Sequence, residues 1–138
     1  MGDNWLFEMK FDGYRAQGAI SGSEVVVYTR NGHDWTRQFK VILPPLQALT
    51  NGSALIDGEI VAIDSQGRTS FSLLKTGIAA GRPLKFYAFD LLELNGDDLT
   101  GRPLLERKER LAILLGERDP DDSLQTAMAE PLLETGEN

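Results

Sequence analysis

Apolar and polar residues alternate near the start of the chain and predict a β-strand over residues 3–11. In an extended strand, residues two apart lie on the same face. One face then carries Trp5, Phe7, Met9 and Phe11, as expected for a strand that covers a core. The other face carries Glu8, Lys10 and Asp12. The pattern therefore holds one lysine between two carboxylates.

Further strands follow, separated by turn signals such as Ser21-Gly22-Ser23 and Asn31-Gly32. β-Branched and aromatic residues favour extended structure. The predicted strands are 14–20, 25–29 and 85–94, together with 54–56 and 59–63, which flank Asp57-Gly58 as one or two strands. These short strands with tight turns predict antiparallel β-sheets.

The clearest predicted helix spans Leu104–Leu115, with Pro103 near its start and Gly116 after its end. A shorter helix is predicted over 46–49, where Pro44-Pro45 opens an apolar stretch, and another over 71–80. Residues 117–138 are acidic and weakly patterned. Hairpins and separate helices together predict an α+β fold, with antiparallel sheets and flanking helices.

Composition limits the classes of function. The chain has 138 residues, 41% of them hydrophobic, which is enough for one domain with a real core. It has no cysteine, so disulfides, cysteine zinc sites and thiol nucleophiles are excluded. The net charge of −7 makes it a poor nonspecific binder of nucleic acid. It has no run of about 18 apolar residues, so we expect no membrane association.

The spacing Glu8-x-Lys10-x-Asp12-Gly13-x-Arg15 resembles motif I of the covalent nucleotidyltransferases, which include ATP-dependent DNA ligases, RNA ligases and mRNA capping enzymes. In that chemistry a lysine amine attacks the α-phosphate of ATP and forms a phosphoramidate with AMP. The resemblance makes Lys10 the expected catalytic nucleophile, with Glu8 and Arg15 in contact with the nucleotide. Taken alone, the segment also fits the solvated charged face of an edge strand.

Three later segments resemble other parts of the same family, in the family's order. In Tyr28-Thr29-Arg30-Asn31-Gly32 the resemblance implies that Arg30 contacts ribose or phosphate. Asp57-Gly58-Glu59 resembles motif III, where Glu59 would contact ribose or hold a metal ion. The stretch from Phe86 to Leu92 resembles motif IIIa, where Phe89 would stack on adenine. Taken alone, each segment also fits a purely structural role. Residues 28–32 fit an exposed turn, residues 57–59 a common turn and residues 86–92 a core strand.

The sequence around motif I is similar to that of bacterial ATP-dependent DNA ligases of the end-joining type, and so is the segment Pro103-Leu104-Leu105-Glu106-Arg107-Lys108. The resemblance implies a nucleotidyltransferase (ATP-grasp-like) ligase adenylation domain. It implies ATP and Mg²⁺ (or Mn²⁺) as cofactors, with Glu59 at the metal. It implies nicked or broken double-stranded DNA as the partner of the parent protein, in repair. We expect a monomer in the cytoplasm, associated with the nucleoid.

Two motifs of the family have no match in residues 1–138. Motif IV is a Glu-Gly followed by apolar residues and a lysine, and motif V supplies a second lysine for the α-phosphate. The oligonucleotide-binding fold that follows in these ligases is also unmatched. We therefore expect residues 1–138 to form a single partial adenylation domain, incomplete at its C-terminal side and weakly active or inactive alone.

Two alternative functions stay open from the sequence. An RNA ligase or mRNA capping-type nucleotidyltransferase shares motif I, although the sequences Asp-Gly-Glu and Phe-Asp-Leu-Leu favour a DNA ligase. A non-catalytic nucleotide- or DNA-binding module would also fit the acidic charge and the unmatched motifs.

Overall fold

The structure, a computed structural model, describes residues 13–29, 32–63, 84–119 and 122–126. The strand predicted over 3–11 and the helix predicted over 71–80 lie outside these ranges. The described strands are β1 (Tyr14–Ser21), β2 (Glu24–Thr29), β3 (Ser53–Ala62), β4 (Leu84–Leu94), β5 (Asp97–Asp98) and β6 (Leu124–Thr126). The helical elements are the 3₁₀ turn η1 (Lys40–Ile42) and the α-helices α2 (Leu43–Gln47) and α4 (Leu104–Leu115).

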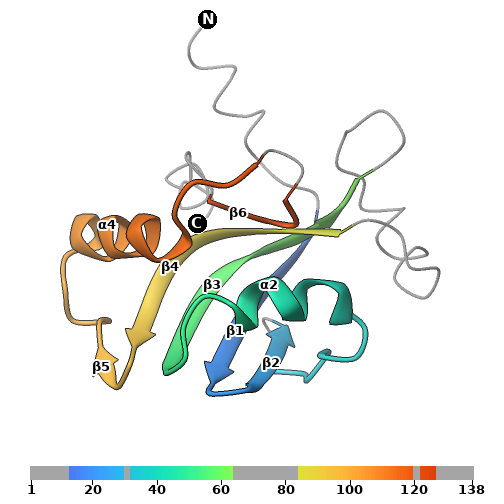
Figure 1. Cartoon of the computed structure of the whole chain (residues 1–138), viewed down its shortest axis with the longest axis horizontal. Helices are drawn as coiled ribbons and strands as arrows, with labels where there is room; N and C mark the ends of the chain where they lie inside the picture. The colour runs from blue at the N-terminus through green and yellow to red at the C-terminus, as the bar shows by residue number, and fades with distance from the viewer. Residues whose placement is uncertain (1–12, 30–31, 64–83, 120–121, 127–138) are drawn as a thin grey trace, which may run out of the picture.

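All six strands belong to one sheet with the order β2-β1-β3-β4-β5, and β6 also pairs with β4 (Figure 1). The pairs along this order are antiparallel, as the sequence predicted. The pairing of β6 with β4 is parallel, which the sequence did not predict. Its three residues are too few to show a period, and Leu124 is fully buried only because the chain returns to Phe86. The predicted segments 54–56 and 59–63 belong to the single strand β3, which runs from Ser53 to Ala62 through Asp57-Gly58.

One face of the sheet packs against the hydrophobic core. Ala16 and Ile20 of β1 and Ile56 and Ile60 of β3 point into this core and are almost completely buried. The covering side chains include Phe39, Ile42 and Leu46 from the segment that forms η1 and α2. The helix predicted over 46–49 is α2, which begins three residues earlier, at Leu43, and ends at Gln47. It has proline in its first turn, where a missing N–H costs no helical hydrogen bond. The opposite face of the sheet is therefore available for polar side chains.

Helix α4 has the bounds predicted from its sequence. Pro103 precedes it, and Gly116 ends it with a φ of 66°, a conformation that glycine adopts without strain. Leu111 and Leu115 are its buried residues, and the helix packs against β4 and β6. The helix therefore lies along β4, at the side of the sheet opposite β1 and β2 (Figure 1).

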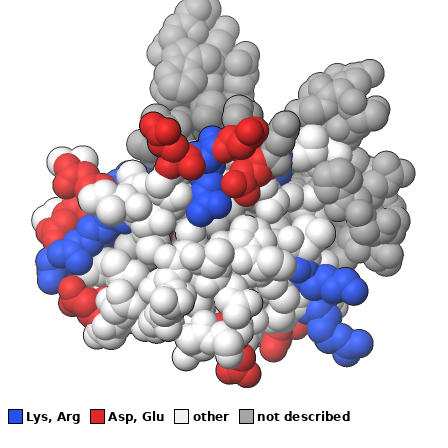
Figure 2. Space-filling view, in the orientation of Figure 1, with Lys and Arg blue, Asp and Glu red and all other residues white. Residues whose placement is uncertain are grey.

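Charged side chains lie around the rim of the face shown in Figure 2, including the part over α4, whereas its centre is uncharged. Near the start of α4, Arg102 and Arg110 both contact Glu106, at 2.6 and 3.2 Å. These pairs are partly exposed, so each contributes little to stability. Within the described ranges, no helix has the length and apolar character needed to cross a bilayer.

Candidate functional site

Three of the six residues predicted for the site lie in the described ranges, and they come from three neighbouring strands. Arg15 lies in β1, Glu59 in β3 and Phe89 in β4. Lys10, Glu8 and Arg30 lie outside the described ranges. The sheet therefore brings together segments that are more than 70 residues apart in the chain.

The strand register places the polar side chains on one face. Arg15 lies directly opposite Glu59, and Glu59 lies directly opposite Tyr87 on β4. Residues that face each other across neighbouring strands point to the same side of the sheet. Glu59 is 7% exposed and is the buried charged residue of the described ranges. Burial also raises the pKa of the Tyr87 hydroxyl above its ordinary value.

Arg15 links the three strands through two contacts. Its Nη2 donates a hydrogen bond to Oδ2 of Asp57 on β3, at 3.1 Å. Its guanidinium carbon lies 4.7 Å from the centre of the Phe89 ring, a cation–π distance. Its buried Nε has no hydrogen-bond partner in the part of the chain that is described. Arg15 therefore brings a positive charge and an unsatisfied donor to the ring of Phe89.

Asp57 is a site residue that the sequence analysis missed. It was named only as part of the Asp57-Gly58-Glu59 motif, with no role. Asp57 precedes Glu59 by two residues in a strand, so period-two spacing already placed both carboxylates on one face. Its pairing with Arg15, however, depends on the register between β1 and β3.

Burial is the main influence on the pKa of Asp57 and raises it above the ordinary value. The Arg15 guanidinium acts in the opposite direction, through its charge and its hydrogen bond. Asp90, which lies directly opposite Asp57 on β4, raises the pKa further. Asp57 is therefore a carboxylate whose charge depends on Arg15.

Period-two alternation along the predicted strand 85–94 places Phe89 and Tyr87 on one face, and the structure confirms this. Tyr87 is opposite Glu59, and the Phe89 ring contacts Arg15 on the same side of the sheet. Phe86 and Ala88 lie on the core side and are buried, also as predicted. The other face of β4 thus carries the predicted base-stacking residue next to the predicted phosphate-binding arginine.

A cavity of about 240 Å³ opens beside Arg15. Its lining residues are Arg15, Ala16, Gln17, Tyr28, Thr29, Gly32 and Asp57. Thr29 and Gly32 are the described residues on either side of residues 30–31, which lie outside the described ranges. The single histidine, His33, is exposed and was given no role.

Gly13 of the predicted motif I has a structural reason to be glycine. A Cβ atom at this position would overlap the carbonyl oxygen of Ile60 on β3, and it would lie 2.8 Å from Cγ1 of Val61. The absence of a side chain therefore lets the chain leading into β1 approach β3 closely. The resemblance to motif I also implies that Gly13 lets the backbone come close to phosphate, and this stays a prediction.

The described ranges contain no group of three or more histidine, aspartate or glutamate side chains arranged to hold a metal ion. Mg²⁺ commonly binds through one or two carboxylates together with substrate phosphates and water. The role of Glu59 at a metal ion stays a prediction.

Solved structures share this fold. The crystal structure of the ligase domain from M. tuberculosis LigD matches with a TM-score of 0.74 and 29% identity, covering 86% of this chain and 38% of that one. Mycobacterial DNA ligase D complexed with ATP and MES matches with a TM-score of 0.69 and 29% identity, over the same shares. The fold is that of a nucleotidyltransferase-type ligase domain. A family model described as the ATP dependent DNA ligase domain matches residues 1–130, and the chain belongs to this family.

Curated relatives agree with this assignment. The multifunctional non-homologous end joining protein LigD of Pseudomonas aeruginosa is 39% identical over 119 residues, which cover 85% of this chain and 14% of that protein. A DNA ligase of Natronomonas pharaonis is 33% identical over 128 residues, covering 83% of this chain and 23% of that protein. The chain thus spans less than a quarter of the length of these two relatives. The predicted resemblance to end-joining DNA ligases and the predicted fold class are confirmed.

Proposed function

We propose that residues 1–138 are the nucleotide-binding part of the adenylation domain of an ATP-dependent DNA ligase that acts in end joining. One observation carries the proposal: Arg15, Glu59 and Phe89 converge from three strands on one face of the sheet. Each offers a different part of ATP a suitable partner, namely a cation for phosphate, a carboxylate for ribose or metal, and an aromatic ring for the base. Family membership supports the same function.

In the proposed first step, the Lys10 amine attacks the α-phosphorus of ATP. A bond forms between Nζ and the α-phosphorus, the bond from that phosphorus to the bridging oxygen breaks, and pyrophosphate leaves. The amine must lose its proton first, although the ordinary pKa of lysine is about 10.4. The carboxylates Glu8 and Asp12 alone would raise that pKa further, so nearby cations must lower it. Arg15 is one such cation.

The remaining predicted residues bind and orient the nucleotide. Phe89 stacks on the adenine, an interaction worth about 1–3 kcal/mol per base. Arg15 and Arg30 hold phosphate and ribose oxygens, for which the planar guanidinium is well suited. Glu8 contacts the nucleotide, and Glu59 contacts ribose or Mg²⁺. Bound Mg²⁺ would neutralise charge that develops on the phosphates.

In the proposed later steps, an oxygen of the 5′-phosphate at a DNA break attacks the phosphorus of the lysyl-AMP. The bond from that phosphorus to Nζ of Lys10 breaks, so AMP is now joined to the 5′-phosphate. The 3′-hydroxyl then attacks that phosphate, AMP leaves, and the strand is sealed. The net charge of −7 means that DNA must be held by a local contact or by other parts of the longer protein. We propose that the parent ligase works as a monomer, which light scattering of the purified parent will test. We also propose that it associates with the nucleoid, which fluorescence microscopy of the tagged parent in cells will test.

The test follows AMP transfer to Lys10. The parent ligase and the 138-residue chain are incubated with ATP and Mg²⁺, and the intact proteins are weighed by mass spectrometry. We expect one AMP per parent ligase, little or none on the 138-residue chain, and none after Lys10→Ala. Lys40→Ala is the matched control, because Lys40 is an exposed lysine on η1. An adduct that survives Lys10→Ala, or a parent ligase without an adduct, would refute the proposal.

A second assay distinguishes the DNA ligase from the RNA ligase or capping alternative, which the relatives do not favour. The parent ligase is given nicked DNA and nicked RNA in parallel. We expect sealing of the DNA nick, and faster sealing of the RNA nick would contradict the proposed substrate.

A further inference from the structure

Phe89 is the extra residue of a β-bulge. On β3 and β4, Gly58 lies opposite Ala88, whereas the adjacent Asp57 lies opposite Asp90. Phe89 therefore has no residue opposite it in the ladder. A bulge disrupts the ladder locally and turns side chains away from their regular direction. Something outside the ladder must therefore set the direction of the Phe89 ring.

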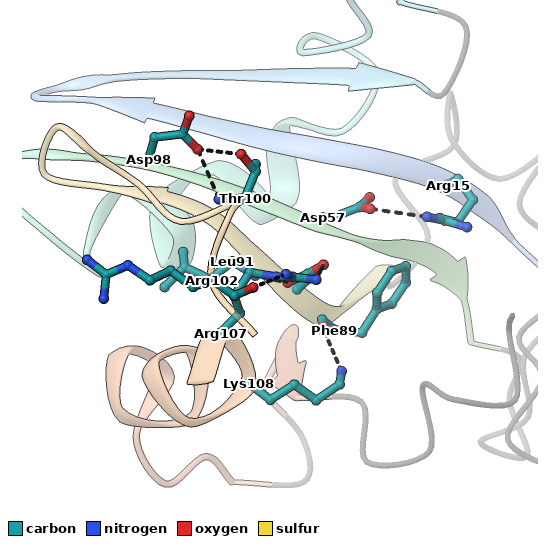
Figure 3. Close-up of polar contacts among 10 residues, drawn as sticks. Arg15, Asp57, Phe89, Leu91, Asp98, Thr100, Arg102, Arg107 and Lys108 are labelled. Atoms are coloured by element: carbon teal, nitrogen blue, oxygen red, sulfur yellow. Dashed lines mark hydrogen bonds and ion pairs between the residues drawn. The ribbon is translucent and has the colours of Figure 1, made fainter. Parts of the chain in front are cut away.

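Helix α4 supplies two contacts at this bulge. Nζ of Lys108 donates a hydrogen bond to the carbonyl oxygen of Phe89 at 2.5 Å (Figure 3). Arg107 binds Asp90, the residue after Phe89, through two hydrogen bonds: Nε donates to Oδ1 at 2.8 Å and Nη2 donates to Oδ2 at 3.2 Å. The Arg107 and Asp90 side chains are each only 17% exposed. Fork-like contacts of this kind fix geometry as well as contributing energy.

The helix itself is held so that both side chains reach the bulge. Leu111 is buried and lies four residues after Arg107 and three after Lys108, so all three lie on neighbouring parts of the helix surface. Arg107 Nη1 also donates to the carbonyl oxygen of Arg102, just before the helix, at 2.7 Å. The position of α4 is thereby linked to the position of Phe89.

A second register shift in the same strand offers a comparison. Leu92 is left without a residue opposite it, between Leu91 and Glu93. Its carbonyl oxygen accepts a hydrogen bond from the backbone N–H of Leu99, at 2.9 Å. Both carbonyls thus find a donor outside β3, as buried backbone groups require. Only at Phe89 is that donor a charged side chain from a helix.

We infer that Lys108 and Arg107 are positioning residues that hold the bulge and thereby aim the Phe89 ring at the base of the bound nucleotide. This inference rests on the proposed function, which makes Phe89 the base-stacking residue. The two residues do not touch the nucleotide in this account; they act through Phe89.

Charge gives Arg107 a second effect on the same ring. Arg15, Asp57, Asp90 and Arg107 form a row across β1, β3, β4 and α4, with a cation at each end. Asp90 faces Asp57, which Arg15 binds. Without Arg107, the unpaired charge of Asp90 would compete for Arg15 and draw it from its place over Phe89. Loss of Arg107 should therefore disturb Arg15 and Phe89 together.

The first test compares ATP with inorganic tripolyphosphate, which has no base to stack. The affinity of the 138-residue chain for each is measured by calorimetry with Mg²⁺. In Lys108→Met we expect about tenfold weaker binding of ATP and an unchanged affinity for tripolyphosphate. Arg110→Met is the matched control, because Arg110 pairs with Glu106 on the same helix. Equal losses for the two ligands would overturn the inference.

A double-mutant cycle tests whether Lys108 acts through Phe89. In a Phe89→Leu background, Lys108→Met should have almost no further effect on ATP affinity, because the ring it aims is already gone. A further loss of about tenfold in that background would overturn the inference. If Lys108→Met does not fold, Arg107→Lys takes its place with the same expectations, since it keeps the charge but loses the fork.

A third measurement separates this inference from the proposed function. The Phe89 ring is followed by NMR with ring-labelled phenylalanine and assigned with Phe89→Leu. Lys108→Met should shift this signal, whereas Lys108→Arg and Arg110→Met should not. Equal shifts in all three variants would overturn the positioning role. A chain that binds neither ATP nor tripolyphosphate but shows the expected NMR pattern would refute the proposed function alone.

Discussion

Gly58→Ala is expected to destabilise the sheet at the centre of the site. Gly58 lies on the core side of β3, between Asp57 and Glu59. A Cβ atom there would lie 2.5 Å from the carbonyl oxygen of Tyr87 and 2.8 Å from Cζ of Phe86. Ordinary contact begins at 3.4 Å, so the added methyl group is about 1 Å too close to backbone and to a buried ring.

The size of the effect follows from these contacts. Overpacking a core costs about 1–3 kcal/mol. We take the upper end, because a backbone carbonyl cannot turn away and Phe86 is only 1% exposed. Replacing glycine by alanine within a strand returns roughly 0.5–1 kcal/mol. The net loss in the free energy of unfolding is therefore about 2 kcal/mol, which lowers Tm by roughly 6–10 °C for a chain of this size.

Urea unfolding followed by circular dichroism measures this loss, with two matched controls. At Gly101 a Cβ atom would meet nothing within 4 Å, so Gly101→Ala should change stability by less than about 0.5 kcal/mol. At Gly18 the nearest atom is Cδ1 of Leu46, at 3.2 Å, and this flexible side chain can give way. Gly18→Ala should fall between the other two. Equal stabilities for Gly58→Ala and Gly101→Ala would refute the reasoning.

Four other predictions concern charge and packing. The folded-state pKa of Asp57 is raised, so its contribution to stability is largest below pH 3.8 and falls as the pH rises through the folded pKa. Urea unfolding across this range should show a fall in the free energy of unfolding that the Asp57→Asn variant lacks. Removing the opposing charge with Arg15→Met should raise that pKa further, and an NMR titration in which it fell would contradict the assignment. Leu111→Ala should cost about 2–5 kcal/mol in unfolding free energy, and a loss under about 1 kcal/mol would show that α4 is not anchored by this residue. Hydrogen bonds from Thr100 lower the pKa of Asp98, so Thr100→Val should return it toward the ordinary value by NMR, and no change would exclude Thr100 as the cause.

Local patterns predicted most of the fold. The bounds of α4 came from a 3.6-residue pattern between Pro103 and Gly116, and the faces of β4 came from period-two alternation. The strand β6 was missed because three residues carry no period, and its pairing depends on a partner almost 40 residues earlier. Prediction succeeded where the signal lies within one element.

The motifs named the candidate site residues one by one but not their arrangement. Motif resemblance singled out Arg15, Glu59 and Phe89, and the structure places these three on one face. It did not single out Asp57 as the partner of Arg15, which lies 42 residues away in the chain. Such pairs depend on strand register, which the motifs do not specify.

The sequence by itself determined which residues alternate, where α4 begins and ends, and which ligase motifs are present. These are local properties, set by backbone periodicity and by the chemistry of single side chains. Only the tertiary structure decided that β4 bulges at Phe89 and that Lys108 and Arg107 meet that bulge. It also decided that Arg15 lies between Asp57 and an aromatic ring. The physical reason is that each of these contacts joins separate elements, so it exists only once strand register and helix position are set together.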